Sequence, residues 1–183
     1  MYQSDSRLNN DQDNSTTATF RVNNHVLSKL RSESEKRQIS LNAYINQILR
    51  HYAEWELFEP KLGLIPFPKR VLADIFANMD AAEIVGLANG VGKNTAIDMS
   101  IFVQGKFNAE LFLSWFESRM NNSGCEVSRR NYGSLQTLII KHDFGKNWSL
   151  YLKTMLESTL KEQFGKAPVT FITDSITSLE WKE

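Results

Sequence analysis

The feature that most constrains this chain is the stretch from Thr17 to Trp55, in which the hydrophobic period changes once. Ala18, Phe20 and Val22 are apolar and alternate with polar residues, and strict alternation predicts a short strand with one buried face. Helical spacing follows and predicts two short amphipathic helices. A domain this small rarely closes a core alone, and the stretch has no cysteine for a disulfide. We therefore expect a second copy of the chain to complete the core.

The predicted second helix begins at a Ser-x-Asn cap, Ser40 and Asn42. The order of strand, helix, cap and helix resembles the ribbon-helix-helix DNA-binding family, the MetJ/Arc type. The resemblance covers roughly a fifth of the chain. In that family, two chains pair their strands into an antiparallel ribbon that enters the major groove.

The resemblance implies a role for each face of the strand. Phe20 and Val22 would face the helical core, whereas Thr17, Thr19 and Arg21 would lie on the opposite face and read base edges. Arginine can fork onto guanine, and threonine can donate, accept or touch a thymine methyl.

The resemblance also implies that Ser40 and Asn42 hold a DNA phosphate through the free N–H groups at the start of the second helix. One residue departs from the family pattern. The family usually has glycine two residues before this serine, and here the residue is Gln38. A left-handed turn at a residue other than glycine costs about 1 kcal/mol, so we expect this turn to differ locally.

The same pattern also fits a helical hairpin at the edge of a larger core, with residues 17–22 as an ordinary edge strand. Charge favours DNA binding. Residues 17–53 carry six Lys and Arg against two Glu, a net charge of +4, in a chain whose total net charge is zero. A basic segment in a neutral chain is typical of a phosphate-binding face.

Composition excludes several classes of protein. The apolar content of 42% and charged content of 23% are typical of a globular protein. We find no apolar run of about twenty residues for a membrane span and no leader pattern. The single cysteine, Cys125, excludes an intramolecular disulfide and suits a reducing compartment. We expect a cytoplasmic protein that does not enter a membrane.

Four segments follow from these patterns. Residues 1–16 are polar and predict a disordered arm, and residues 17–58 form the predicted DNA-binding and dimerisation domain. Residues 59–68 contain three prolines and a glycine and predict a stiff linker. Residues 69–183 form a C-terminal domain. The predicted fold class is α+β: a ribbon-helix-helix, then a helical segment and a ββαββ antiparallel layer.

The helical segment of the C-terminal domain has several start and stop signals. We expect helices over 69–79 and 108–121, and a capping box between Asp80 and Glu83. The run GLANGVGKNT fails the spacing of a Walker phosphate loop. Its glycines predict the end of one helix, with Asn94 or Thr95 starting another. Ile101–Val103 fits either that helix or a short buried strand.

The last third of the chain has a β pattern. Gly133-Ser134 predicts a two-residue hairpin turn whose paired residues sum to 267. A long helix ending at Gly165 and two strands, 169–173 and 176–181, follow. The string HDFGKNWSLYL is similar to C-terminal domains of uncharacterised archaeal proteins, which implies no function.

The hairpin register places Cys125 opposite His142. Such a pair could hold a soft metal or a reactive thiolate. Two ligands do not make a zinc site, which needs about four. We therefore expect a buried strand end here, and neither a metal site nor a cofactor, unless two chains share one.

The leading hypothesis is a sequence-specific DNA-binding transcriptional regulator. Its predicted partners are double-stranded DNA and a second copy, with tetramers possible, and the C-terminal domain would sense an effector that the sequence does not identify or would assemble dimers. The alternative is an antitoxin-like or structural protein whose N-terminal segment dimerises and whose C-terminal domain binds a protein or ligand. We find no serine motif, carboxylate pair or phosphate loop, and so do not expect an enzyme.

Overall fold

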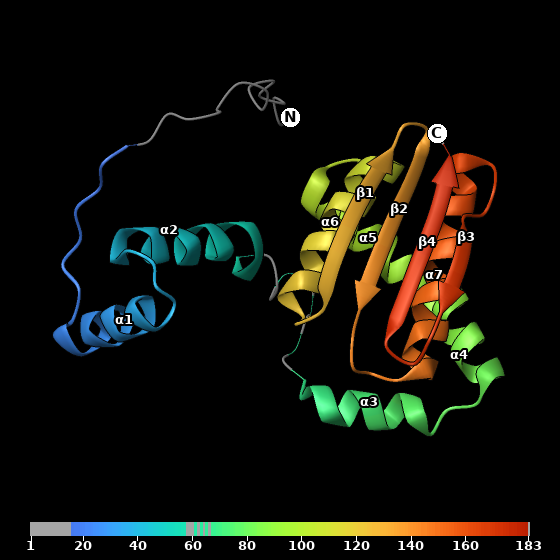
Figure 1. Cartoon of the computed structure of the whole chain (residues 1–183), viewed down its shortest axis with the longest axis horizontal. Coiled ribbons are helices and arrows are strands. Elements are labelled where there is room, and N and C mark those ends of the chain that lie inside the picture. The colour runs from blue at the N-terminus through green and yellow to red at the C-terminus, as the bar shows by residue number, and fades with distance from the viewer. Residues whose placement is uncertain (1–15, 58–60, 62, 64, 66, 183) are drawn as a thin grey trace. The chain divides into compact units, whose positions relative to one another are not determined.

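The computed structural model describes residues 16–57, 61, 63, 65 and 67–182. The chain divides into two compact units, residues 1–57 and 58–183 (Figure 1). The predicted disordered arm lies outside the described residues except for Thr16, as do residues 59, 60, 62, 64 and 66 of the predicted linker.

The first unit contains two helices and a terminal π turn: α1 (Asn24–Lys36), α2 (Leu41–His51) and η1 (Tyr52–Glu56). Asn23 caps α1 by accepting from the backbone N–H of His25 at 2.8 Å. Residues 16–23 form neither helix nor strand in the single chain. The strand predicted over residues 17–22 is therefore not shown, and the strands of the described chain lie in its C-terminal half.

The turn between α1 and α2 is left-handed, and Gln38 carries it. Gln38 has φ 56°, the only positive φ at a non-glycine residue in the described part of the chain. Its N–H donates to the Glu35 carbonyl, and the Ile39 N–H donates to the Ser34 carbonyl, both at 3.0 Å. These two bonds form a Schellman motif with Gln38 at the position that glycine usually fills. The expectation that this turn differs locally from the family pattern was therefore wrong, because Gln38 adopts the left-handed conformation that glycine usually adopts there.

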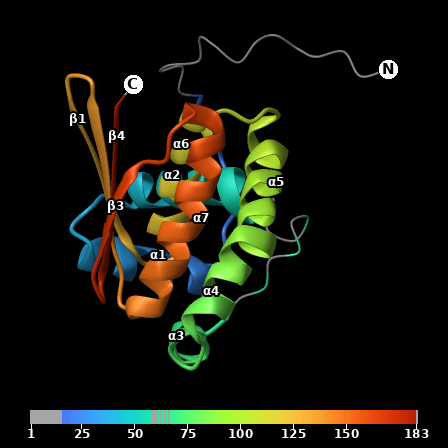
Figure 2. The ribbon, with the colours of Figure 1, turned by 90° about the vertical axis from the view of Figure 1, so that its right-hand side faces the viewer.

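The second unit is α+β. Its four-stranded antiparallel sheet has the order β1-β2-β4-β3, from β1 (Glu126–Tyr132), β2 (Leu135–Lys141), β3 (Val169–Ile172) and β4 (Ile176–Lys182). Figure 2 shows the sheet edge-on, with α6 and α7 against one face and α4 and α5 in a further layer. No helix among the described residues of this unit covers the other face, and Val169 and Phe171 of β3 are 69% and 65% exposed there.

The helices of the second unit follow most of the sequence signals. Their bounds are α3 (Lys69–Ala77), α4 (Ala81–Leu87), η2 (Ala88–Gly92), α5 (Lys93–Gln104), α6 (Ala109–Asn122) and α7 (Lys146–Phe164). The capping box is confirmed: Asp80 accepts from the Glu83 N–H, and the Asp80 N–H donates to the Glu83 carboxylate, both at 2.8 Å. Asn108 caps α6 through the N–H of Leu111 at 2.9 Å.

The prediction that the glycine run ends a helix was wrong. The chain stays helical from Ala81 to Gln104, with Ala88–Gly92 wound as a π turn, so Ile101–Val103 is helical. Packing overrides the helix-breaking tendency of glycine here. A Cβ on Gly92 would lie 2.9 Å from Cε2 of Tyr151, so glycine lets this turn approach α7 closely.

The hairpin register is confirmed. Val127 pairs with Ile140 and Glu126 with Lys141, as the sum of 267 requires. Leu138 and Ile140 are fully buried on the helix-covered face, together with Leu179 of β4. The centre of the sheet therefore supplies one wall of the core.

Replacing Gln38 with glycine should stabilise the protein. We expect Gln38→Gly to raise the free energy of unfolding by about 1 kcal/mol, because glycine adopts a positive φ without the steric cost of a Cβ. Gln38→Ala is the matched control, since it keeps the Cβ and should change little. Urea denaturation at fixed protein concentration measures both; equal stability of the glycine and alanine variants would contradict strain at this residue.

Candidate nucleic-acid interface

The three residues that the resemblance assigns to base reading lie in the extended segment before α1. Thr17, Thr19 and Arg21 are all exposed. Phe20 and Val22 alternate with them and are also exposed, at 67% and 42%. A single copy thus holds both sets of side chains in solvent. Pairing with another strand would place the apolar set on one face and the polar set on the other.

The start of α2 offers backbone donors to an anion. Ser40 caps the helix by accepting from the Ala43 N–H at 3.1 Å, and the first turn closes when the Tyr44 N–H donates to the Ser40 carbonyl at 3.0 Å. The N–H groups of Leu41 and Asn42 precede this bond and have no acceptor within the helix. They are the type of donor that binds phosphate at a helix N-terminus.

The side chain of Asn42 is directed to its own helix. Its Oδ1 accepts from Nδ2 of Asn46 at 3.4 Å, and the same Nδ2 donates to the Asn42 carbonyl at 2.9 Å. A phosphate contact at Asn42 would therefore use the backbone N–H. Ser40 and Asn42 lie together at one helix end, whereas the structure does not join them to Thr17, Thr19 or Arg21.

The first unit leaves its apolar side chains largely exposed. Among its described residues only Ser34 is buried. Seven large apolar side chains are at least 39% exposed: Phe20, Val22, Val26, Ile48, Leu49, Tyr52 and Leu57. They come from the extended segment, both helices and the end of the unit. An exposed apolar surface on a small unit is typical of a site that contacts another molecule.

Charged side chains accompany this surface. Lys36 donates to Glu33 at 2.6 Å, and this hydrogen bond lowers the pKa of Glu33 and raises the pKa of Lys36. The guanidinium of Arg37 lies 5.1 Å from the ring centroid of Tyr44. The pair of Lys36 and Glu33 contributes no net charge, so the net charge of +4 over residues 17–53 comes from the other charged residues of that stretch.

The second candidate pair, Cys125 and His142, lies in the other unit. Both residues are buried. His142 uses both ring nitrogens: the Phe144 N–H donates to Nδ1 at 3.3 Å, and Nε2 lies 2.8 Å from the Ser149 hydroxyl. That hydroxyl donates to the Thr173 carbonyl at 2.7 Å, so Nε2 carries the proton and donates to Ser149.

These bonds give His142 a structural role. The imidazole joins the end of β2 to α7, and Ser149 extends the link to the turn between β3 and β4. Burial lowers the pKa of His142 and raises that of Cys125, so a neutral ring and a protonated thiol are favoured. No group of three or more metal-ligating side chains occurs among the described residues.

Sequence reasoning missed Arg129. This arginine lies on the helix-covered side of β1, forms hydrogen bonds of 2.8 and 2.6 Å with the Glu110 carboxylate of α6, and lies 5.6 Å from the ring centroid of Trp181. The sequence signal for Arg129 was the alternation along the strand. Val127, Arg129 and Asn131 share a face, because residues two apart in a strand point to the same side. Arg129 thus fastens a helix to the sheet.

Comparison with known proteins assigns no family: no family model, curated protein or solved structure matches the chain. In the described part of the chain, no helix is long and apolar enough to span a membrane.

The protonation of His142 should affect stability. Burial places its folded-state pKa below the ordinary value of about 6.5. Below that value the unfolded chain takes up a proton that the folded protein resists, so stability is full above about pH 6.5 and falls with decreasing pH.

We expect wild type to lose more unfolding free energy between pH 7 and pH 5 than His142→Gln does, as measured by urea denaturation at each pH. The carboxyl pKa of Asp143 is lowered by its ion pair with Lys69, so it titrates below this window. Equal losses in the two proteins would show that His142 does not resist protonation.

Proposed function

We propose that this chain is a sequence-specific DNA-binding transcriptional regulator that acts as a homodimer and places a two-stranded β-ribbon in the major groove. One observation carries the proposal. A segment without regular secondary structure, in which polar and apolar residues alternate, precedes two helices joined by a left-handed turn, and apolar side chains from all three lie exposed in the single copy.

Pairing two copies would pair the open backbone groups of residues 17–22 and bury exposed apolar side chains in one step. Antiparallel pairing of residues 17–22 with the same residues of a second copy would occupy the open N–H and C=O groups of both segments. Phe20 and Val22 would then pack against the helices, and Thr17, Thr19 and Arg21 would line the outer face. The width of the major groove, about 12 Å, admits such a ribbon.

The N-terminus of α2 would position the ribbon. Each copy would present the N–H groups of Leu41 and Asn42 to a phosphate, held in place by the Ser40 cap. Two such contacts, one on each side of the groove, would fix the orientation of the ribbon without reading sequence. The net charge of +4 over residues 17–53 supports attraction to DNA.

The second unit would regulate the first by sensing a ligand or would assemble dimers further. The sheet face without helices exposes Tyr132, Val169 and Phe171 at 62%, 69% and 65%, which favours an assembly role for that face. The proposed activity is binding rather than catalysis.

Mutations should distinguish the proposed base reading by Arg21 from the proposed phosphate binding at Ser40. We expect Arg21→Ala to weaken binding to a selected operator by roughly 1–3 kcal/mol and to change the affinity for random DNA little. Ser40→Ala should weaken both by similar amounts, because a phosphate contact carries no base information. Fluorescence anisotropy measures the affinity of each variant for a duplex selected from a random pool and for a scrambled duplex.

The salt dependence provides a control, since phosphate contacts release counterions. Titration at two salt concentrations should give binding that weakens with salt. Equal loss on both duplexes for Arg21→Ala would contradict base reading. Failure to select any duplex, together with salt-independent binding, would contradict the proposed function and leave the first unit as a dimerisation device.

The dimer should depend on Phe20. We expect light scattering to give twice the mass of the chain at micromolar concentration, and Phe20→Ala to reduce dimer stability by about 3 kcal/mol, since truncating a buried phenylalanine costs about 3–5 kcal/mol. Phe171→Ala is the matched control, because Phe171 has nearly the same exposure, 65%, in the other unit. A monomeric wild type, or a dimer lost only in Phe171→Ala, would contradict pairing through residues 17–22.

A further inference from the structure

The sheet face that no described helix of the second unit covers, named here the open face, carries a row of small and large side chains. The register joins Ser128 to Ile139, Ile139 to Ser178, and Ser178 to Phe171. Directly paired residues point to the same side of an antiparallel sheet, and Leu138, the residue before Ile139, is fully buried on the helix-covered face. Small and large side chains therefore alternate across the open face from β1 to β3.

The next row of the open face carries opposite charges. Arg130 pairs with Thr137, Thr137 with Glu180, and Glu180 with Val169. Arg130 and Glu180 are exposed, and Val169 is 69% exposed. The row therefore presents a cation on the edge strand β1, a carboxylate on the inner strand β4 and an apolar side chain on the edge strand β3.

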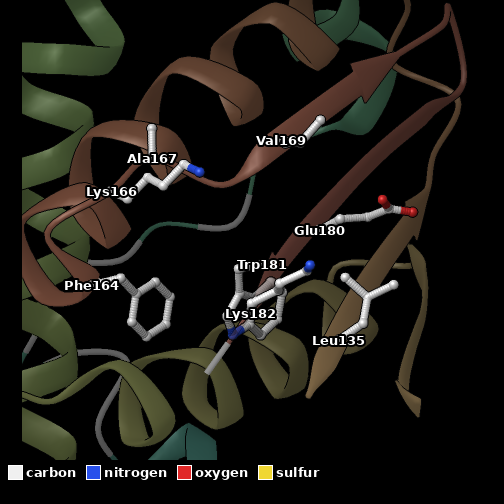
Figure 3. Close-up of a pocket in the computed structure, with 8 residues that line it drawn as sticks. All are labelled: Leu135, Phe164, Lys166, Ala167, Val169, Glu180, Trp181 and Lys182. Carbon is white, nitrogen blue, oxygen red and sulfur yellow. The ribbon is translucent and has the colours of Figure 1, made fainter. Parts of the chain in front are cut away.

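A hollow of about 300 Å³ lies at the end of α7, next to the last residues of β4. Among the described strands, β3 begins opposite Glu180 and leaves the end of β4 without a neighbour on that side. Figure 3 shows Leu135, Val169 and Glu180 along one side of the hollow. At the other edge of the sheet Tyr132, which is 62% exposed, begins the row that continues through Leu135 to Lys182. The hollow therefore lies at the far end of the row that begins with this tyrosine.

A two-fold axis makes the row of small and large side chains complementary to itself. An axis parallel to the strands, midway between β2 and β4, would place β1 of one copy over β3 of the other and β2 over β4. Phe171 would then face Ser128 of the second copy, and Ile139 would face Ser178. Each large side chain meets a small one, as interdigitated packing requires. The strands of the two sheets stay aligned, as is usual within about 30° for sheets packed face to face.

The same axis matches charge and shape in the other two rows. Arg130 would lie over Val169 of the second copy, and Glu180 of that copy would be only one strand away, about 4.8 Å to the side. Tyr132 would lie beyond Lys182 of the second copy, where the hollow is. A cavity of about 150 Å³ holds one benzene, so a hollow of about 300 Å³ has room for a tyrosine ring. Each match occurs twice, because a two-fold interface uses the same patch on both copies.

The area of the open face indicates when this contact forms. Four strands about 4.8 Å apart, with a rise of about 3.3 Å for each of up to seven residues, give a face of roughly 400 Å². A stable interface buries about 800 Å² on each partner, so the open face is too small to hold two free copies. Copies that are already joined present it at a high effective concentration.

We propose that the open faces of the two second units pack against each other within the dimer, with Tyr132 of each copy in the hollow of the other and Arg130 beside Glu180 of the other copy. The inference rests on the proposed function for the joining of the two copies. It adds a second contact between them and assigns the open face to the same two chains.

Charge reversal distinguishes a contact between copies from one within a copy. One full-length chain carries Arg130→Glu and the other Glu180→Arg, and the two are unfolded together and refolded at equal concentrations. Each homodimer then has two repelled pairs, whereas the heterodimer has two attracted pairs. If each change from repulsion to attraction shifts the populations about threefold, native mass spectrometry should give about nine-tenths heterodimer instead of the statistical half.

A matched mixture controls for net charge. Arg70 and Asp74 are exposed on α3, which packs against α7 on the helix-covered side of the sheet. Chains with Arg70→Glu and Asp74→Arg carry the same net charges as the first two variants, and their mixture should stay close to half heterodimer.

A second measurement needs no change to the charged pair. Dimers are formed from a chain with ¹³C-labelled methyl groups and an unlabelled chain, and filtered nuclear Overhauser spectra select contacts between the copies. We expect cross-peaks from an aromatic ring of the unlabelled chain to the methyl groups of Leu135 and Val169, and their loss when the unlabelled chain carries Tyr132→Leu.

The outcomes separate this inference from the proposed function. Half heterodimer in both mixtures, an equal excess in both, or wild-type dimers without these cross-peaks would overturn the packing of the open faces and leave the ribbon dimer standing. An excess in the first mixture alone, with a dimer that Phe20→Ala does not weaken, would support the packing of the open faces and contradict the ribbon. A monomeric wild type would overturn both.

Discussion

The apolar side chains of residues 16–57 exceed what two short helices can cover in one copy of the chain. Phe20 and Leu49 remain 67% and 49% exposed although they belong to elements with clear amphipathic spacing. Burial of such groups is the main favourable term in folding, so a partner surface would add to the stability of the unit. In the proposed dimer the same pairing would create the core and the DNA-reading face, because alternate residues of a strand point to opposite sides.

The proposed arrangement would couple assembly to recognition. Residues 16–23 have no ladder in the single chain, so a ribbon would exist only in the dimer. Stability and DNA affinity would then both depend on protein concentration by mass action. The left-handed turn at Gln38 and the Ser40 cap form within one copy, so the helix end proposed to bind phosphate would be ready before pairing.

The parts of the fold that could be predicted from the sequence are those set by interactions between residues close together in the chain. The capping box of Asp80 and Glu83 involves residues three apart, and the hairpin at Gly133 fixes its register through a two-residue turn. Both signals act within a few residues, so the sequence displays them directly. The strand order β1-β2-β4-β3 depends on where α7 returns the chain, and no local pattern contains that information. The proposed base-reading and phosphate residues could be named only through a family resemblance.

Packing between distant segments accounts for the rest. The glycine run before Lys93 has the composition of a helix end, yet its close approach to Tyr151 favours a continuous helix. A second hollow, of about 320 Å³, is lined by residues from four helices, the π turn and the loops next to them, with no common spacing. Among the described residues the indole N–H groups of Trp115 and Trp148 lack partners, and this is visible only once these helices are packed. Aromatic residues at helical spacing indicated a core and gave no sign of a hollow within it.

The π turn at Ala88–Gly92 also sets the phase of the helix that follows. A π turn holds one more residue per hydrogen-bonded ring than an α-helix does, so this segment acts as a built-in one-residue insertion. Winding the same residues as a regular α-helix would rotate everything after them by about 100°, since an α-helix has about 3.6 residues per turn. Thr95, Ala96 and Met99 share one side of α5 and line the second hollow from it. The extra residue is therefore what aims this face of α5 at α6 and α7.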